Sequence, residues 1–231
     1  MIEDKRIVVI IPAYNEEESL PLVIENIPCF VDEIVVTNNG STDNTVEVAK
    51  RAGATLLTEI RKGYGFACLK AMDYIRGKNY DIVVFLDGDY SDYPEEMNFI
   101  VEPIIQNDYD LVLGSRMNSK RDKGAMLPQA IFGNWLASSL INFFWKYIFT
   151  DLGPFRAIKY TSLISLNMQD KNFGWTVEMQ IKAAKQKLKT IEIPVRYRKR
   201  IGQSKVTGTI QGTVKASAKI LYLIFVSLFK D

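Results

Sequence analysis

Short apolar segments alternate with helix-like segments through the first half of the chain, and this alternation constrains the fold more than any other feature. The apolar segments have the length of strands, and the segments between them have the polarity of surface helices. The expected strands are Arg6–Pro12, Glu33–Thr37, Thr55–Thr58, Asp81–Leu86 and Asp110–Leu113, and the expected helices are Glu16–Ile27, Asp43–Ala52, Phe66–Arg76 and Pro94–Gln106. This order predicts an α/β fold with a mostly parallel sheet flanked by helices.

Local signals mark the ends of three of these helices. Asn15 is expected to cap Glu16–Ile27, with Glu18 in the position of a capping box. Gly53 and Gly77 follow the next two helices, where glycine commonly ends a helix.

The regular alternation of strand-like and helix-like segments ends after Leu113. Residues 115–128 form a polar stretch that we expect to be a loop. The elements expected beyond it are an aromatic-rich helix at Gln129–Phe149, a strand at Phe155–Lys159, a helix at Thr176–Gln186, a strand at Thr190–Arg196, a basic loop at Arg198–Gly208 and a final helix at Thr209–Phe229. Because the sequence contains no repeat or obvious linker, we expect one domain over 1–231, with halves at 1–114 and 115–231.

The composition excludes several classes of function. The chain has 231 residues and no histidine, so Ser-His-Asp and Cys-His mechanisms and histidine-containing zinc sites are excluded. Its net charge of +2 argues against a nucleic-acid binder that works through bulk charge. Cys29 and Cys68 form no CxxC pair, which favours a reducing, cytoplasmic compartment over a disulfide framework.

We expect neither a signal peptide nor a transmembrane helix. The apolar run Ile7–Ile11 is short for a signal peptide and is stopped by Pro12. Within Thr209–Phe229, Lys215 and Lys219 would each cost about 3 kcal/mol at the middle of a bilayer. This helix is expected either to pack on its own domain or to lie at a membrane surface or partner interface.

Polar side chains gather where four of the expected strands end. The clusters are Tyr14-Asn15-Glu16, Asn38–Asp43, Asp87-Gly88-Asp89 and Ser115-Arg116. Ligands of an open parallel sheet bind beyond the carboxyl ends of its strands, so these loops are expected to form one site.

The Asp87-Gly88-Asp89 cluster is the candidate metal site. Two carboxylates separated by one glycine can hold a hard divalent cation such as Mg²⁺ or Mn²⁺ and leave positions for phosphate oxygens. An acidic turn exposed to solvent is the alternative when this segment is considered alone.

Two further segments have the composition of anion sites. Lys62-Gly63-Tyr64-Gly65 leads into a helix whose first N–H groups favour a diphosphate, with a plain loop as the alternative. Arg200, Ser204 and Lys205 lie in a basic loop that is suited to phosphate or simply solvated. Glu178 is either an acceptor-side carboxylate or a favourable charge in the first turn of a helix.

As an ordered set these segments resemble glycosyltransferase family 2, whose members have the GT-A fold, over almost the whole chain. The motifs are IIPAYNEEESL at 10–20, NNGSTDNT at 38–45, KGYGFA at 62–67, LDGDYSDYPEE at 86–96, GSR at 114–116, DLGPFRAI at 151–158, GWTVEM at 174–179 and RIGQSK at 200–205. The last three are similar to those of dolichyl- and polyprenyl-phosphate mannose and glucose synthases. The chain departs from the family pattern in having Asn38-Asn39 for an acidic pair and Ser91-Asp92 for Gln-His.

The resemblance implies a Rossmann-like GT-A fold in which 1–114 bind the nucleotide-sugar and 115–231, with C-terminal helices, the acceptor. It implies a nucleotide-sugar site made of Pro12, Ala13, Tyr14, Glu16, Asn39, Asp43, Gly65, Asp87, Gly88 and Asp89. It also implies Mg²⁺ or Mn²⁺ on Asp87 and Asp89, and phosphate contacts from Arg116, Arg200, Ser204 and Lys205.

The function implied is an inverting, metal-dependent transfer of a hexose from GDP-mannose or UDP-glucose to a polyprenyl or dolichyl phosphate. A phosphate acceptor is already anionic and needs no general base. A soluble or glycan hydroxyl acceptor would need one, for which Asp151 and Glu178 are the candidates. The expected catalytic residues are therefore Asp89, Arg116, Asp151 and Glu178.

Two other classes of function stay open at this stage. A nucleotidyltransferase also places aspartates on Mg²⁺, but it should show a glycine-rich basic loop after the first strand, where this chain has Pro-Ala-Tyr-Asn-Glu. A non-catalytic sugar-nucleotide sensor would work through its aromatic and C-terminal helices. The expected partners are a nucleotide-sugar, a lipid phosphate and either a membrane surface or a second copy of the chain, without nucleic acid. The expected location is the cytoplasm or the cytoplasmic face of the membrane.

Overall fold

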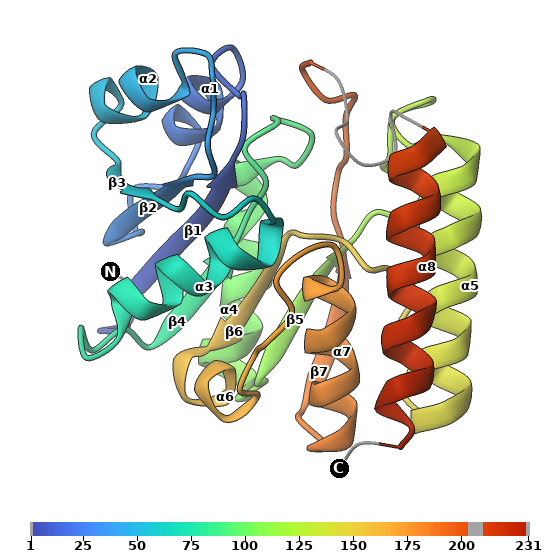
Figure 1. Ribbon diagram of the computed structural model, residues 1–231. Coiled ribbons are helices and arrows are strands. Elements are labelled where there is room, and N and C mark those ends of the chain that lie inside the picture. The colour runs from blue at the N-terminus through green and yellow to red at the C-terminus, as the bar shows by residue number, and fades with distance from the viewer. Residues whose placement is uncertain (1, 203–209, 230–231) are drawn as a thin grey trace.

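Seven strands form one sheet in the order β3-β2-β1-β4-β6-β5-β7 in the computed structural model, which describes residues 2–202 and 210–229 (Figure 1). The strands are β1 (Ile7–Ala13), β2 (Glu33–Asn38), β3 (Thr55–Thr58), β4 (Ile82–Phe85), β5 (Leu111–Ser115), β6 (Arg156–Lys159) and β7 (Thr190–Pro194). Only β6 runs antiparallel to its neighbours, β4 and β5. The predicted α/β fold with a mostly parallel sheet is therefore confirmed.

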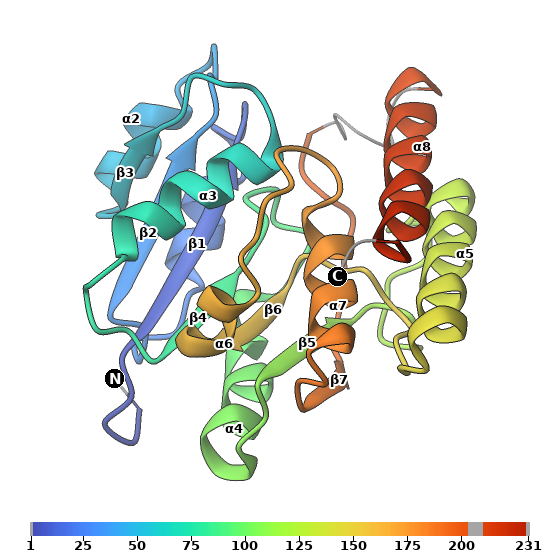
Figure 2. The same cartoon turned by 60° about the horizontal axis from the view of Figure 1, so that its bottom comes forward.

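Helices cover both faces of this sheet (Figure 1, Figure 2). They are α1 (Leu20–Glu25), α2 (Thr45–Arg51), α3 (Tyr64–Ile75), α4 (Met97–Asn107), α5 (Pro128–Trp145), α6 (Tyr160–Ser165), α7 (Trp175–Lys185) and α8 (Ile210–Ser227), with a 3₁₀ turn at Pro94–Glu96 before α4. One apolar core joins α1, α2 and α4 to the sheet, and a second joins α3, α6 and α7 to its other face. Helices α5 and α8 lie side by side at the outer end of the second layer (Figure 1).

Strand β1 shows how the sequence builds these two layers. Its residues Ile7–Ile11 are all fully buried, and successive side chains point to opposite faces of the sheet. Val8 and Ile10 therefore contribute to the core under α3, whereas Ile7 and Val9 contribute to the core under α1 and α4. A continuous apolar run is expected for a parallel strand that is covered on both sides.

The strand order creates a crevice beside β1. The chain leaves β1 for β2 on one side, and β4 pairs with β1 in parallel on the other side. The carboxyl ends of β1 and β4 consequently lie next to each other at the switch point, where open α/β sheets bind their ligands.

Several predicted element boundaries differ from the structure. The helix predicted at Glu16–Ile27 begins at Leu20, and Asn15 has a φ of +54° and does not cap it. Instead, the Asn15 side chain accepts a hydrogen bond from the Thr42 amide (2.8 Å). The aromatic-rich helix ends at Trp145, before Lys146 in the left-handed conformation, and α6 was not predicted.

None of the described helices is both long and apolar enough to cross a bilayer. The division into halves at 1–114 and 115–231 stays a prediction, although β6 and β7 of the second half complete the sheet of the first.

Candidate active site

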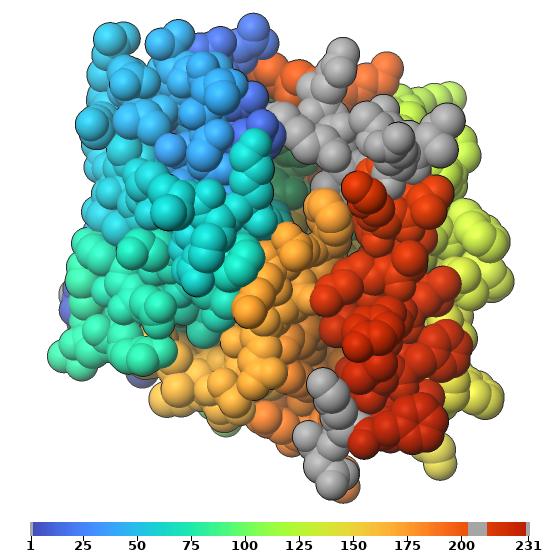
Figure 3. Space-filling view, viewed as in Figure 1, coloured from blue at the N-terminus to red at the C-terminus, as the bar shows by residue number. Residues whose placement is uncertain are grey.

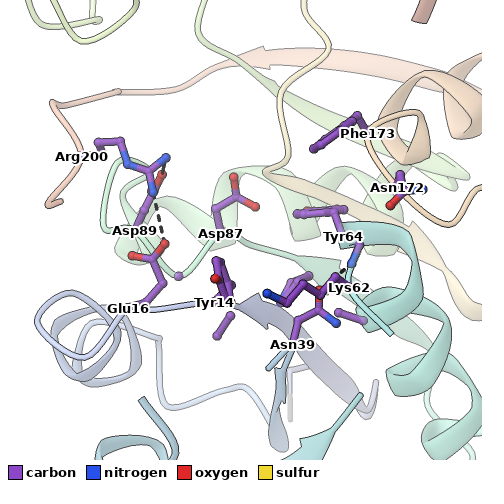
Figure 4. Close-up of a pocket in the computed structure, with 15 residues that line it drawn as sticks. Tyr14, Glu16, Asn39, Lys62, Tyr64, Asp87, Asp89, Asn172, Phe173 and Arg200 are labelled. Carbon is purple, nitrogen blue, oxygen red and sulfur yellow. Dashed lines mark hydrogen bonds and ion pairs between the residues drawn. The ribbon is translucent and has the colours of Figure 1, made fainter. Parts of the chain in front are cut away.

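A pocket of about 330 Å³ opens at the carboxyl ends of β1 and β4. We call it the first pocket; Figure 3 shows the hollow between α3 and the segment before α7, and Figure 4 shows its side chains. It is lined by Pro12, Ala13, Tyr14, Glu16, Asn39, Lys62, Gly63, Tyr64, Ala67, Asp87, Gly88, Asp89, Asn172, Phe173 and Arg200. The structure thus brings together six distant parts of the chain, and these include residues of three of the four polar clusters at the strand ends.

A second pocket of about 600 Å³ adjoins the first. Tyr64, Asp87, Phe173 and Arg200 line both, so these four residues form the junction of the two pockets. The remaining walls come from the 116–134 region, the 152–154 and 175–176 segments, Tyr197, Lys199 and α8. Arg116, Lys199 and Arg200 are its cationic lining residues, and much of the rest is apolar.

Asp87 is the carboxylate at the junction. Its Oδ1 atom is buried and has no hydrogen-bond partner among the described residues. Burial and then the negative charge of Asp89 raise the pKa of Asp87 to about 7, against the opposing effects of Arg200, Tyr64 and Arg116. A half-buried carboxylate that has one buried oxygen without a partner and lines two pockets is poised to bind a cation.

Asp89 is held in a different way. Its Oδ1 accepts hydrogen bonds from the Ser91 amide (2.9 Å) and hydroxyl (2.5 Å), and its Oδ2 lies 3.0 Å from an Arg200 Nη atom. Arg200 also donates to Glu16 at 3.1 Å (Figure 4). The guanidinium of Arg200 therefore joins the loop after β1 to the loop after β4 across the mouth of the first pocket.

Backbone hydrogen bonds keep Arg200 in this place. The Ile201 amide donates to the Asp89 carbonyl (3.0 Å), and the Arg198 amide donates to the Ser91 carbonyl (2.9 Å). The first residues of the predicted basic loop thus run alongside the turn that carries Asp89. Ser204 and Lys205, which were predicted to bind phosphate, lie outside the described residues.

The side chain of Asn39 builds the opposite wall of the first pocket. Its Nδ2 donates to the carbonyls of Glu59 (3.1 Å) and Arg61 (2.8 Å), and its Oδ1 accepts from the Gly63 amide (2.7 Å). This network fixes the loop that carries Lys62, whose ammonium lies 5.4 Å from the centre of the Tyr14 ring. An aspartate at this position could not donate the two hydrogen bonds, which explains one departure from the family pattern.

Asp151 does not line either pocket. Its carboxylate is fully buried and accepts three hydrogen bonds from Arg116, one from the backbone amide (2.6 Å) and two from the guanidinium (2.9 and 2.7 Å). Burial alone would raise the pKa of Asp151, but the charge and hydrogen bonds of Arg116 lower it. The structure therefore gives Asp151 a role in orienting Arg116, which lines the second pocket.

Glu178 also lies away from both pockets. It is buried and accepts hydrogen bonds from the amides of Gln169 (3.0 Å) and Asp170 (2.7 Å), and it pairs with Lys182 at 2.8 Å. As placed, neither Asp151 nor Glu178 faces a substrate pocket, as a general base would have to.

Two predicted nucleotide residues have structural contacts instead of pocket positions. Asp43 accepts hydrogen bonds from Thr45 (3.0 Å from the amide) and Glu17 (3.2 Å), and thus organises the start of α2. A Cβ on Gly65 would lie 2.0 Å from the Asp170 carbonyl oxygen, so the glycine permits close packing of α3 on that segment. Pro12, Ala13, Tyr14, Glu16, Asn39, Asp87, Gly88, Asp89 and Arg200 do line the first pocket.

Six lining residues of the first pocket were absent from the predicted site: Lys62, Gly63, Tyr64, Ala67, Asn172 and Phe173. Lys62 and Tyr64 belong to a motif that the sequence already marks as an anion site, so their position could have been inferred. Asn172 and Phe173 carry no such signal, because they reach the pocket only through the packing of the segment before α7.

The site fits a divalent cation if a ligand completes the coordination. No cluster of three or more Cys, Asp or Glu side chains in the described part of the chain is arranged to hold a metal alone. Asp87 and Asp89 supply two carboxylates, and the Oδ1 atom of Asp87 has no partner among the described residues. A diphosphate in the first pocket would provide the missing oxygen ligands.

Comparison with known proteins identifies the family. The family model described as "Glycosyl transferase family 2" matches residues 8–165. An uncharacterized glycosyltransferase of Mycobacterium tuberculosis is 32% identical over 91% of this chain and 94% of its own length. An undecaprenyl-phosphate mannosyltransferase of Micrococcus luteus is 27% identical over 90% of each chain.

The fold is shared with a solved enzyme structure. Glucosyl-3-phosphoglycerate synthase from Mycobacterium tuberculosis, crystallised with Mn²⁺, UDP and glucosyl-3-phosphoglycerate, superposes with a TM-score of 0.77 at 21% identity. The match covers 97% of this chain and 80% of that one. With this GT-A-like architecture and the matches in sequence, the chain belongs to glycosyl transferase family 2.

Proposed function

We propose that the chain is an inverting glycosyltransferase that moves a hexose from a nucleoside diphosphate sugar to a polyprenyl or dolichyl phosphate. The observation that carries the proposal is the pair of pockets that meet at Asp87. A donor in one pocket and an acceptor in the other would bring their reacting atoms together at this junction. The name of the Micrococcus luteus relative supports a lipid phosphate as acceptor.

The first pocket has the groups that a nucleoside diphosphate requires. Tyr14 offers an aromatic face for the base, and Lys62 and Arg200 offer positive charge to the phosphates. Asp87 and Asp89 would hold Mg²⁺ or Mn²⁺, which stabilises the charge that develops on a leaving diphosphate. The ion pairs of Arg200 with Glu16 and Asp89 would then hold these two side chains in place at the mouth of the pocket.

The second pocket is suited to a phosphate on an apolar chain. Arg116, Lys199 and Arg200 provide cationic groups, and residues such as Leu127, Leu152 and Ile220 provide apolar walls. Asp87 is the one carboxylate in its lining among the described residues. A phosphate acceptor suits this arrangement because its oxygen is already anionic and attacks without a general base.

A soluble phosphate-bearing acceptor is the second candidate. It is favoured by the structural neighbour, which was crystallised with phosphoglyceric acid in another complex. The same cations of the second pocket would bind its phosphate, and the apolar walls would then have no specific role.

We also propose that the α5–α8 pair contacts a membrane surface, where a lipid acceptor resides. Large side chains including Phe132, Trp135, Phe143 and Tyr222 are more than half exposed on these two helices. A dimer interface between copies of this chain is the alternative use of this surface.

Product analysis tests the proposal. The purified protein is incubated with Mn²⁺, GDP-mannose or UDP-glucose, and either polyprenyl phosphate or 3-phosphoglycerate, and the products are identified by mass spectrometry. A lipid-linked hexose that is absent with the Asp89→Asn variant is the expected result. A soluble glycoside alone would support the second candidate. In a parallel reaction with GTP or UTP and a hexose 1-phosphate, release of pyrophosphate would indicate a nucleotidyltransferase. Nucleotide binding without turnover of any acceptor would indicate a sensor.

A further inference from the structure

The segment 169–174, which we call the wall loop, contributes to the junction of the two pockets. Asn172 lines the first pocket, and Phe173 lines both. In Figure 4 both side chains lie on the same side of the pocket as Tyr64, across from Arg200 and Glu16. The position of the wall loop therefore sets the shape of the junction where the reacting groups would meet.

Two buried carboxylates hold the backbone of the wall loop. Glu178 accepts hydrogen bonds from the amides of Gln169 and Asp170. Asp170 in turn uses Oδ1 to accept hydrogen bonds from the amides of Asn172 (2.8 Å) and Gly174 (2.9 Å). Four backbone amides of the wall loop are thus bound by these two side chains, and Phe173 lies between the two amides that Asp170 binds.

Helix α3 fixes the wall loop from the donor side. The Phe66 amide donates to the Lys171 carbonyl at 3.1 Å. A Cβ on Gly63 would lie 2.2 Å from the same carbonyl oxygen, so the two backbones are in direct contact. The donor side of the loop is therefore held by the motif that carries Lys62.

Helix α8 fixes the wall loop from the acceptor side. The Lys219 ammonium lies 2.9 Å from Asp170 Oδ2, and the Asp170 side chain is only 1% exposed. This part of α8 thus contacts both the wall loop and the second pocket. Lys219 pairs with Asp170, and the pocket is lined by Ala216, Ser217 and Ile220. Lys219 is the cation that compensates the buried charge of Asp170.

We propose that Lys219 is a positioning residue for the transfer reaction: through its ion pair with Asp170 it holds Phe173 and Asn172 at the junction of the pockets. This inference rests on the proposed function. Without the ammonium group, Asp170 keeps a buried and uncompensated charge, and the loop that depends on its Oδ1 relaxes towards solvent. Lys219 does not line either pocket itself, so it acts only through the loop.

Three variants of the full chain test this role. Lys219→Met removes the charge and keeps most of the apolar stem, whereas Lys219→Arg keeps the charge. Lys215→Met is the matched control, because Lys215 is an exposed lysine one turn earlier on α8. If Lys219→Met fails to fold, the Asp170→Asn/Lys219→Met double variant removes both charges and leaves an acceptor for the Asn172 and Gly174 amides.

Hydrogen exchange and kinetics are the two measurements. In Lys219→Met we expect amide exchange of a peptide that covers 169–174 to accelerate about tenfold. We expect kcat to fall about tenfold with the KM for the donor changed less than threefold, because Asn39, Lys62 and Arg200 are untouched. Lys219→Arg should restore both, and Lys215→Met should match the parent.

Unchanged exchange and unchanged kcat in Lys219→Met would overturn the proposal, and so would a lower melting temperature with normal kcat in the folded protein. The exchange measurement needs no substrate. If the parent transfers no sugar, the proposed function fails, but the exchange rates still decide whether Lys219 holds the wall loop.

Discussion

At the scale of single residues, the three aspartates after β4 differ sharply in their surroundings. Asp89 is satisfied by Ser91 and Arg200. Asp87 has an unpartnered oxygen and lines both pockets. Asp92 is also buried, and neither of its oxygens has a partner among the described residues, but it lines no pocket. Burial and then the charge of Asp87 raise the pKa of Asp92 well above its usual value.

This contrast separates a ligand-binding role from simple burial. Asp87→Asn should abolish Mn²⁺-dependent binding of UDP or GDP and lower the transfer rate at least 100-fold, without lowering the melting temperature, because it removes a buried charge that repels Asp89. Asp92→Asn, a matched substitution in the same turn, should keep both activities, because Asp92 lines neither pocket. Calorimetric titration and thermal unfolding measure these effects. Equal losses in both variants would contradict the assignment of the metal to Asp87.

The two asparagines after β2 allow a similar comparison. Asn39→Asp replaces two donated hydrogen bonds with repulsion between a carboxylate and the carbonyls of Glu59 and Arg61, which should cost about 3 kcal/mol of unfolding free energy. The same change should weaken nucleotide binding, since the Lys62 loop depends on this network. Asn38→Asp should cost at most about 1 kcal/mol, because Asn38 Oδ1 only accepts a hydrogen bond from the Ser41 amide. Urea unfolding curves of the two variants measure the difference; comparable costs would show that the donated hydrogen bonds are unimportant.

At the scale of elements, the sequence predicts which loops converge but not which charges pair. The alternation of strands and helices places the turns after β1, β2 and β4 at one edge, and the polar residues of these turns line the first pocket. The pairs Arg116–Asp151 and Lys219–Asp170 join segments far apart in the chain, and their formation depends on tertiary packing. Asp151 and Glu178 have the residue type and motif context of catalytic bases. Because tertiary contacts bury their carboxylates, they line neither pocket.

The start of α1 shows the same limit. The pattern at 15–18 fits a capping box, yet tertiary contacts override it. The amides of Asn15, Glu16 and Glu17 donate to side chains of Ser41, Thr45 and Asp43 in the loop after β2 and at the start of α2. These contacts hold Glu16 in the wall of the first pocket, outside the helix, and α1 begins only at Leu20.

The contact between α3 and the wall loop gives a prediction at this scale. Gly65→Ala would place a Cβ 2.0 Å from the Asp170 carbonyl, and the two backbones would have to separate. We expect a loss of about 2 kcal/mol or more in unfolding free energy and faster amide exchange at 169–174. Gly133→Ala in α5 is the control for stability, because a Cβ there meets no atom within 4 Å and alanine favours a helix by about 1 kcal/mol. A stable Gly65→Ala variant with normal exchange would show that the two elements are not tightly packed.

At the scale of the whole molecule, the nucleotide side and the α5–α8 side have different surfaces. The first pocket opens at the sheet edge, whereas the α5–α8 pair, which lies at the end of the molecule away from β3 (Figure 1), lines the second pocket. This pair exposes large aromatic side chains. Phe132 is 61% exposed, Trp135 56% and Phe143 76%. Lys146 is exposed directly after α5. Exposed aromatic groups beside a cation are typical of surfaces that lie in the interface of an anionic membrane.

Vesicle binding tests this reading of the surface. The protein should float with anionic phospholipid vesicles at low salt, and Phe132→Ser/Trp135→Ser should weaken that binding at least tenfold, because each large apolar side chain contributes about 1.5 to 3 kcal/mol when it is fully removed from water. Phe99→Ser is the control, since Phe99 is 46% exposed on α4, across the sheet from α5 and α8. Light scattering of the same samples distinguishes the alternative: if the parent is a dimer, ignores vesicles and becomes monomeric in the double variant, the aromatic surface joins two copies of the chain instead of contacting lipid.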